Sequence, residues 1–183
     1  FVLVSAMAAS GQATDAVVKL DPFEISGRAV DLVGEADSAS QGRVGAAELA
    51  QRPFLRRGEL LEVIPGVVIT QHSGGGKANQ YFLRGFNLDH GTDFSIAADG
   101  MPVNQRTHAH GQGYADLNFM IPEFVREVEV NKGPFYADVG DFSAAGAAEY
   151  RFFDELPRDF VSVEAGSYGF ARAVAGRTYS RGG

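Results

Sequence analysis

The hydrophobic residues of this chain fall into short runs that are separated by glycine, proline and polar residues. Runs that are β-branched or aromatic, or that alternate with polar residues, predict strands at Val67–Thr70, Gln80–Leu83, Phe94–Ala98, Phe124–Lys132 and Glu149–Phe153. Runs that are followed by proline predict short helices at Ala46–Gln51 and Gly58–Ile64. A helical turn is expected at Ala115–Met120, and the Asp99-Gly100 pair predicts a tight turn.

The strand at Phe124–Lys132 has the clearest alternation. Val128 and Val130 are expected on one face together with Arg126, and the glutamates between them on the other face. Arg84 and Arg126 lie in otherwise apolar strands, and an unpaired buried charge is costly. We therefore expect both arginines to have a structural role and to pair with carboxylates such as those of Glu127 and Glu129.

The last part of the chain has a different pattern. Phe160–Ala165 alternates, with Val161, Val163 and Ala165 on one face, and Phe170–Tyr179 is extended again after a tight connection. Two strands of this length with a short turn fit a transmembrane hairpin. An ordinary soluble hairpin has the same periodicity, so both interpretations stay open at this point.

The first residues predict targeting and a linker. Residues 1–13 are apolar and then small, as in the second half of a secretory signal peptide, although a buried N-terminal element is the alternative. The absence of a basic region before this run indicates a truncated signal peptide. Residues 14–27 contain short extended patches and are expected either to be a disordered leader or to pair with a partner's sheet edge. Residues 28–45 are small and polar, which predicts a flexible linker.

Composition narrows the classes of function. The 183 residues suit one domain, and the 45% hydrophobic fraction is enough for a core. The net charge of −7, with no basic stripe, argues against a nucleic-acid partner. The chain has no cysteine, which excludes disulfides, zinc knuckles and thiol catalysis. Gly74-Gly75-Gly76 is not followed by the residues of a phosphate-binding loop, and no serine, histidine and aspartate form a recognisable triad.

The polar loops at residues 72–79 and 104–114 hold the candidate binding chemistry. His108 and His110 flank one residue, so in an extended segment both side chains point to the same side, which suits a metal or a metal chelate. Asp89, His90 and Asp93 add donors from another loop. The alternative is that these are solvated residues that contact a ligand through hydrogen bonds. We therefore expect ligand contacts but no metal, at the four histidines His72, His90, His108 and His110.

Four segments, in order, resemble the plug domain of TonB-dependent outer-membrane receptors. They are Glu59–Val67 with Ile64-Pro65-Gly66-Val67, Phe82–Phe86 with Arg84-Gly85, Ala98–Val103 with Asp99-Gly100, and Val125–Pro134 with Gly133-Pro134. The residues that the resemblance makes structural are Pro65, Gly66, Arg84, Gly85, Asp99, Gly100, Arg126, Gly133 and Pro134. The family often has Gly-Gly near the end of the plug, where this chain has Ala145-Gly146-Ala147.

The resemblance implies an α+β fold, in which a small mixed β-sheet plug with short flanking helices precedes the first antiparallel strands of a transmembrane β-barrel. It implies residues 1–13 as truncated signal peptide, 14–45 as coupling segment and linker, 46–153 as plug and 158–183 as incomplete barrel. It also implies strand addition by periplasmic TonB to a coupling segment whose residues include Val17, Val18, Lys19, Leu20, Phe23 and Ile25.

The implied activity is TonB-dependent import of a scarce small molecule through the bacterial outer membrane, with no catalysis and no cofactor. The imported ligand would be a siderophore, another metal chelate, a cobamide or an oligosaccharide. The partners would be TonB, the ligand, the membrane and the chain's own C-terminal barrel. Two other hypotheses stay open: a secreted soluble domain that binds a ligand without transport, and a metal-dependent enzyme that uses the loop histidines.

Overall fold

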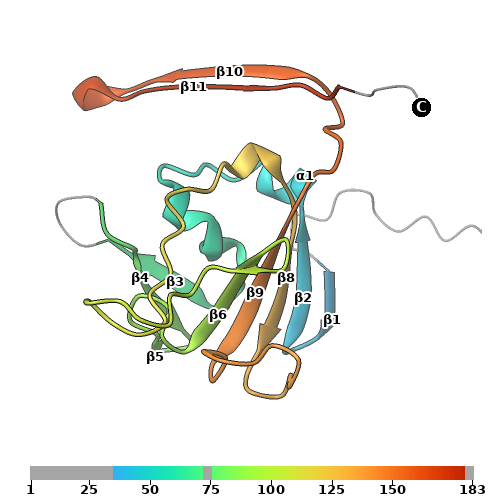
Figure 1. The fold of residues 1–183 in the computed structure, drawn as a ribbon. Coiled ribbons are helices and arrows are strands. Elements are labelled where there is room, and N and C mark those ends of the chain that lie inside the picture. The colour runs from blue at the N-terminus through green and yellow to red at the C-terminus, as the bar shows by residue number, and fades with distance from the viewer. Residues whose placement is uncertain (1–34, 72–75, 180–183) are drawn as a thin grey trace, which may run out of the picture.

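The computed structural model describes residues 35–71 and 76–179, and its main element is a six-stranded mixed sheet (Figure 1). The strand order is β1-β2-β8-β9-β6-β7. All neighbours pair antiparallel except β6 and β9, which are parallel. The strands are β1 Glu35–Ser38, β2 Gln41–Gly45, β6 Phe94–Ala98, β7 Met101–Pro102, β8 Val125–Lys132 and β9 Gly146–Phe152.

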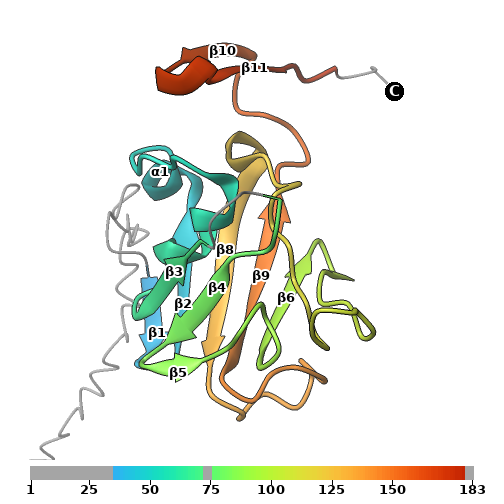
Figure 2. The same ribbon diagram turned by 90° about the vertical axis from the view of Figure 1, so that its left-hand side faces the viewer.

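A smaller antiparallel sheet lies in front of the first in the order β3-β4-β5 (Figure 2). Its strands are β3 Val67–Thr70, β4 Gln80–Leu83 and β5 Phe86–Asn87. The helices are short: α1 Ala46–Leu49, and the 3-10 helices η1 Arg57–Val63, η2 Pro122–Phe124 and η3 Ser167–Gly169. The described part of the chain contains no helix that is both long and apolar enough to cross a membrane.

One hydrophobic core joins the two sheets and η1. It includes Leu60 and Ile64 around η1, Tyr81 from β4, Ile96 from β6 and Tyr150 from β9, all of them at most 1% exposed. Both sheets bury apolar side chains in this one core, so the hydrophobic effect holds the sheets against each other. The ends of the loops between the strands are thereby fixed. The predicted class, a small mixed sheet with short flanking helices, is therefore confirmed.

Three local expectations differ from the structure. The predicted flexible linker is wrong over residues 35–45, because β1 and β2 pair with each other and β2 pairs with β8. The helical turn expected at Ala115–Met120 is not helical: only residues 118–119 lie in a turn, closed by the hydrogen bond from the Met120 amide to the Leu117 carbonyl at 3.0 Å. Arg126 does not share the buried face of Val128, because the register of β8 against β9 shifts between Val125 and Glu127 and leaves Arg126 exposed.

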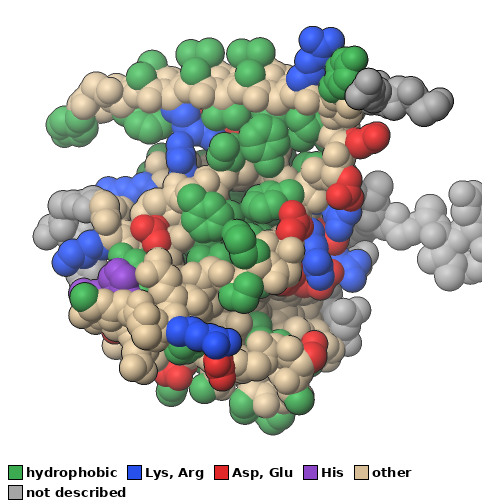
Figure 3. All heavy atoms as spheres, viewed as in Figure 1, with side chains coloured by type: hydrophobic (Ala, Val, Ile, Leu, Met, Phe, Trp, Pro, Cys, Tyr) green, Lys and Arg blue, Asp and Glu red, His purple; other side chains and the backbone are tan. Residues whose placement is uncertain are grey.

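A separate hairpin, β10 Phe160–Ala165 and β11 Ala171–Gly176, lies across one end of the main sheet (Figure 1, Figure 2). Val161 and Val163 are 78% and 76% exposed and lie opposite Ala175 and Ala173. Apolar side chains therefore line the outer face of the hairpin, as Figure 3 shows. The opposite face covers a cavity of about 1190 Å³ whose lining includes Phe54, Phe153 and Phe160.

An ion pair ties the hairpin to the sheet domain. The Arg172 guanidinium donates to both carboxylate oxygens of Glu123, at 2.6 and 2.7 Å, and also to Glu164 at 2.9 Å. The hydrogen bonds from Arg172 hold the pKa of Glu123 below its ordinary value of 4.5. A bidentate pair of this kind is stronger than a neutral hydrogen bond and fixes an orientation.

We predict that Arg172→Met weakens the attachment of the hairpin by about 2 kcal/mol, the usual size for hydrogen bonds to a charged group. Because the folded-state pKa of Glu123 is lowered, its contribution is complete above pH 4.5 and is lost as the pH falls through the lowered value. Amide hydrogen exchange in β10 and β11 measures the attachment. The control is Arg177→Met, whose exposed partner Asp159 lies 3.6 Å away. Equal exchange in the two variants would contradict the prediction.

Candidate functional site

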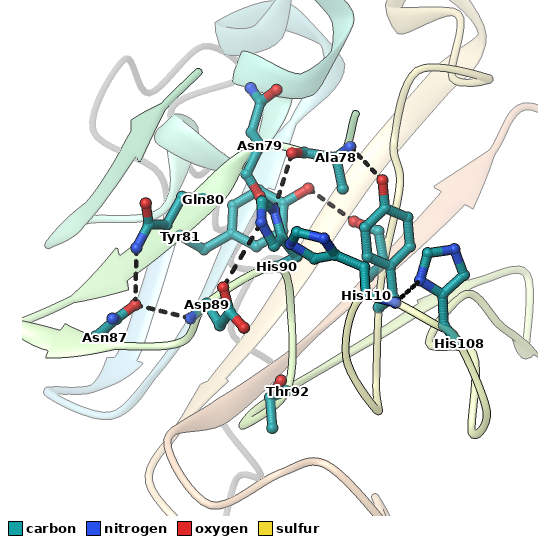
Figure 4. A network of polar contacts seen from close by, with 12 residues as sticks. Ala78, Asn79, Gln80, Tyr81, Asn87, Asp89, His90, Thr92, His108 and His110 are labelled. Carbon is teal, nitrogen blue, oxygen red and sulfur yellow. Dashed lines mark hydrogen bonds and ion pairs between the residues drawn. The ribbon is translucent and has the colours of Figure 1, made fainter. Parts of the chain in front are cut away.

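Three histidines from two loops come together beside the small sheet. His90 lies in the turn after β5, and His108 and His110 lie in the loop between β7 and η2 (Figure 4). The turn at His90 is held by its neighbours: the Asp89 amide donates to Asn87 Oδ1 at 2.8 Å, and the Tyr81 amide donates to the Asp89 carbonyl at 2.8 Å. Asp89 itself has a positive φ of 49°, which short polar residues tolerate better than others.

His90 is only 3% exposed, and its environment defines its orientation. Its Nδ1 lies 2.9 Å from the Ala78 carbonyl oxygen and 3.1 Å from that of Asn79. Carbonyl oxygens only accept, so Nδ1 carries the hydrogen. The other ring nitrogen, Nε2, lies 3.6 Å from Asp89 Oδ1.

Asn104 shapes the second loop and is buried. Its Oδ1 accepts from the Ile96 amide at 2.6 Å, and its Nδ2 lies within 3.0 Å of the carbonyl oxygens of Gly91, Phe94 and Gly113. These contacts join the start of the second loop to its end and to the loop that carries His90. The loop therefore folds back on itself, and Gln105 and Tyr114 form an isolated antiparallel bridge at its base.

Tyr114 organises the imidazole rings. It is 8% exposed, and its hydroxyl accepts from the Ala78 amide at 2.6 Å. His108 stacks on it with ring centroids 4.0 Å apart and an interplanar angle of 15°. His110 meets His90 edge to face at 4.5 Å. Beneath them, burial raises the pKa of Tyr81, so its hydroxyl stays protonated and donates to the Ala115 carbonyl at 2.9 Å.

The side chains whose ligand atoms lie close together are not the expected pair of His108 and His110. Asp89, His90 and His110 each place one ligand atom within 4.8 Å of the others. His108 has a separate role, because its Nδ1 accepts from the His110 amide at 3.2 Å while its ring stacks on Tyr114. Asp93 is not part of this group, and His72 lies outside the described residues. The site therefore draws on two loops rather than on the His108 and His110 pair.

The motif residues form turns and pairs that support these loops. Arg84-Gly85 and Asp99-Gly100 join adjacent strands, and all four residues have positive φ, as a type I′ hairpin turn requires. Asp99 also accepts from the Phe152 amide through Oδ1 at 3.1 Å. The structural interpretation of these two pairs fits their geometry.

The two arginines differ in their partners. Arg126 pairs with Glu127 at 3.0 Å, as expected, and also with Asp154 at 3.6 Å. Arg84 instead donates to the Ala39 carbonyl at 3.1 Å. Pro65 and Gly66 connect η1 to β3, and the Arg84 amide donates to the Gly66 carbonyl at 3.0 Å. The Gly133 amide, ahead of Pro134, donates to the Ala145 carbonyl at 2.7 Å.

Sequence reasoning missed Asn104 and Tyr114. Neither residue belongs to a pattern that predicts a site, and both lay in a segment expected to be a solvated loop. The only local signal was an aromatic residue and an amide at the two ends of a glycine-rich stretch. Their structural role is visible only in the folded chain, where both side chains are buried and their polar groups are hydrogen-bonded.

Comparison with known proteins supports one family. The family model described as TonB-dependent receptor plug domain matches residues 35–147. The copper transporter OprC is 25% identical with a TM-score of 0.54, over 78% of this chain and 22% of that one. The ferric enterobactin receptor PfeA of Pseudomonas aeruginosa, as a mutant in complex with enterobactin, is 25% identical with a TM-score of 0.50, over 64% and 18%.

The siderophore receptor PirA of Acinetobacter baumannii has the same fold, with 24% identity and a TM-score of 0.51, over 69% of this chain and 19% of that one. This chain spans only 18%, 19% and 22% of these three proteins. The family match covers β1 to the start of β9, which is the whole of the smaller sheet and most of the larger one. The chain therefore belongs to the TonB-dependent receptor plug domain family.

Proposed function

We propose that this chain is the plug of an outer-membrane receptor that imports a scarce small molecule with energy supplied through TonB, and that it is not an enzyme. The observation that carries the proposal is the family match over residues 35–147, on a sheet domain that holds two polar loops at one site. A plug of this kind blocks a pore, and its loops contact the ligand. The ferric enterobactin receptor and the copper transporter favour a siderophore, a metal chelate or a metal ion as cargo.

The ligand-contacting residues in this proposal are His90, His108 and His110. His108 and His110 are exposed, and His90 lies behind them, so a ligand meets two imidazoles at the surface and a third beneath. Tyr114 is buried and supports them, because the ring of His108 stacks on it. The cavity between the plug and the hairpin lies elsewhere and is lined mainly by α1, the loop that follows α1 and the hairpin itself.

The hairpin β10–β11 is, in the same proposal, the start of the barrel. Its outer face carries Val161 and Val163 with Ala173 and Ala175 opposite, which suits contact with lipid. The inner face carries Arg172, which binds the plug through Glu123. An apolar outer face is the pattern of a strand in a barrel wall, and the face toward the cavity is mixed, with Ser162, Glu164 and Arg172 beside Phe160.

TonB is proposed to add a strand to residues 17–25, which lie outside the described residues. Strand addition uses backbone hydrogen bonds, and proline has no N–H to donate. We predict that Val18→Pro abolishes retention of the chain by an immobilised periplasmic TonB domain. Val30→Pro, in the polar segment that follows, is the matched control and should be retained like the unchanged chain. Equal retention of both variants would sink the coupling assignment without affecting family membership.

A further inference from the structure

We propose that Asp89, His90 and His110 form a binding site for a divalent transition-metal ion of the Zn²⁺ or Cu²⁺ type. The site is argued from the geometry of these three side chains. Only the role of the metal as cargo, free or as part of a chelate, rests on the proposed function.

The spacing of the donor atoms fits a metal with small adjustments. Zn²⁺ binds imidazole nitrogen at about 2.0–2.1 Å and carboxylate oxygen at about 2.0–2.2 Å, so ligand atoms around it lie about 3–4 Å apart. His90 Nε2 and Asp89 Oδ1 are already 3.6 Å apart. All three donor atoms lie within 4.8 Å of one another, so His110 needs to move by about an ångström to complete the set.

His90 has the second contact that metal-binding histidines usually show. A ligating imidazole normally donates its other N–H to a carbonyl or carboxylate, which sets the tautomer and the direction of the ring. Here Nδ1–H is directed at the carbonyl oxygens of Ala78 and Asn79, at 2.9 and 3.1 Å. In the neutral ring the lone pair is then on Nε2, which faces Asp89 Oδ1. Nε2 and Asp89 Oδ1 therefore offer two donor atoms, 3.6 Å apart, to one metal ion.

The side chains of Asp89, His90 and His110 are not held equally firmly, and this difference suits the binding of a metal ion from solvent. The backbone at His90 is held by a hydrogen bond from the Ala115 amide to its carbonyl, at 2.8 Å. Asp89 and His110 are exposed, so an ion has a path to the site. His108 keeps the loop of His110 close through its stacking on Tyr114. A buried first ligand, an entry path and a third ligand on a tethered loop are what an uptake site needs.

The chemistry of the donors selects the ion. Two imidazoles and one carboxylate suit Zn²⁺, Cu²⁺, Ni²⁺ or Fe²⁺, whereas Ca²⁺ and Mg²⁺ prefer oxygen donors. Three protein ligands leave at least one coordination position for water or for a donor of a chelator. The same site therefore accepts a free ion or one that arrives partly coordinated.

The test is titration calorimetry of the purified 183-residue chain with ZnCl₂ and, separately, with CuCl₂. One equivalent of one of these ions should bind to the unchanged chain. His110→Ala and Asp89→Asn each remove one ligand from an exposed position, and each should weaken binding by at least about 100-fold, since even outer-shell changes cost 10–100-fold. His90→Asn should have the same effect, because its amide nitrogen stands in for Nδ1 toward the two carbonyls while Nε2 is lost.

Asp93→Asn is the matched control for Asp89→Asn, since Asp93 is a carboxylate of the same loop that lies outside the three-residue set, and its affinity should stay close to that of the unchanged chain. X-ray absorption of the zinc-loaded chain should show two imidazole nitrogens at about 2.0–2.1 Å. Unchanged affinity in His110→Ala and His90→Asn overturns the proposal, and so does an equal loss in Asp93→Asn. The titration contains no TonB, so a negative result leaves TonB retention unaffected, and a failure of TonB retention leaves metal binding unaffected.

Discussion

Asn104→Asp is expected to lower the free energy of unfolding by about 4 kcal/mol at pH 7. The change replaces the Nδ2 amide group, which lies within 3.0 Å of three carbonyl oxygens, by a carboxylate oxygen that repels them. Each buried polar group that loses its partner costs about 1–3 kcal/mol, and a buried charge costs more. Aspartate can still accept the hydrogen bond from the Ile96 amide, so the decrease in stability measures the contribution of the Nδ2 donor alone.

The effect should depend on pH. In the folded chain the new carboxyl favours its protonated form, so its pKa is raised above the ordinary value of about 3.9. The destabilisation is then smallest below that value, where both states are protonated, and it grows as the pH rises and the unfolded chain ionises. Urea unfolding at pH 4 and pH 7 measures both values. Gln105→Ala, at the exposed neighbouring position, is the control, and an Asn104→Asp chain as stable as this control at pH 7 would refute the role given to the amide.

The same variant tests the connection between the network and the histidines. Asn104 joins the loop of His90 to the loop of His108 and His110 through the Gly91 and Gly113 carbonyls. Loss of this connection should therefore separate His110 from His90, whose rings now meet at 4.5 Å. We expect metal binding by Asn104→Asp to weaken under conditions where circular dichroism shows that the chain is still folded.

The second large effect is expected for Gly146→Ala, also about 4 kcal/mol of lost stability. Gly146 has φ of +146°, a region closed to residues with a Cβ, which costs about 1–3 kcal/mol. An added Cβ would also lie 2.3 Å from the Asn131 carbonyl oxygen and 3.0 Å from the Lys132 Cα. These are backbone atoms that cannot rotate away, so overpacking adds about 1–3 kcal/mol.

Gly146 has this large effect because three strands meet there. It pairs with Lys132 of β8 on one side and with Phe94 of β6 on the other. With a urea dependence of about 2 kcal/mol per molar, the midpoint should fall by about 2 M. Gly45→Ala is the control, since no atom lies within 4 Å of its added Cβ and its φ is not positive. A midpoint shift no larger than that of Gly45→Ala would show that β8, β9 and β6 tolerate a side chain at this junction.

The site illustrates how a plug combines a stiff frame with adaptable loops. Tyr81, Tyr114 and Asn104 are buried and hydrogen-bonded, so they position the loops without being exposed to a ligand. His108 and His110 project from this frame and are exposed. The hydrogen-bonded frame therefore lies below the surface together with His90, and His108 and His110 are the exposed residues among those proposed to meet a ligand.

Local features of the fold were predictable from the sequence because they depend on neighbouring residues. The strands at Val67–Thr70, Gln80–Leu83 and Phe94–Ala98 follow from alternation and β-branching, and the structure has the same bounds. The turn at Asp99-Gly100 follows from the tolerance of these residues for positive φ. The four plug motifs in order pointed to the family that the comparison then supported.

Only the tertiary structure decided which segments meet. The small, polar residues 35–45 gave no strand signal, yet they form β1 and β2, because β8 offers the backbone partners that complete the sheet edge. Likewise, Asp89 and His90 lie far from His110 in the sequence, and Asn104 and Tyr114 bring the loops together through hydrogen bonds and ring contacts. Periodicity reports how a residue relates to its neighbours, whereas backbone pairing and burial between distant segments exist only once the chain has folded.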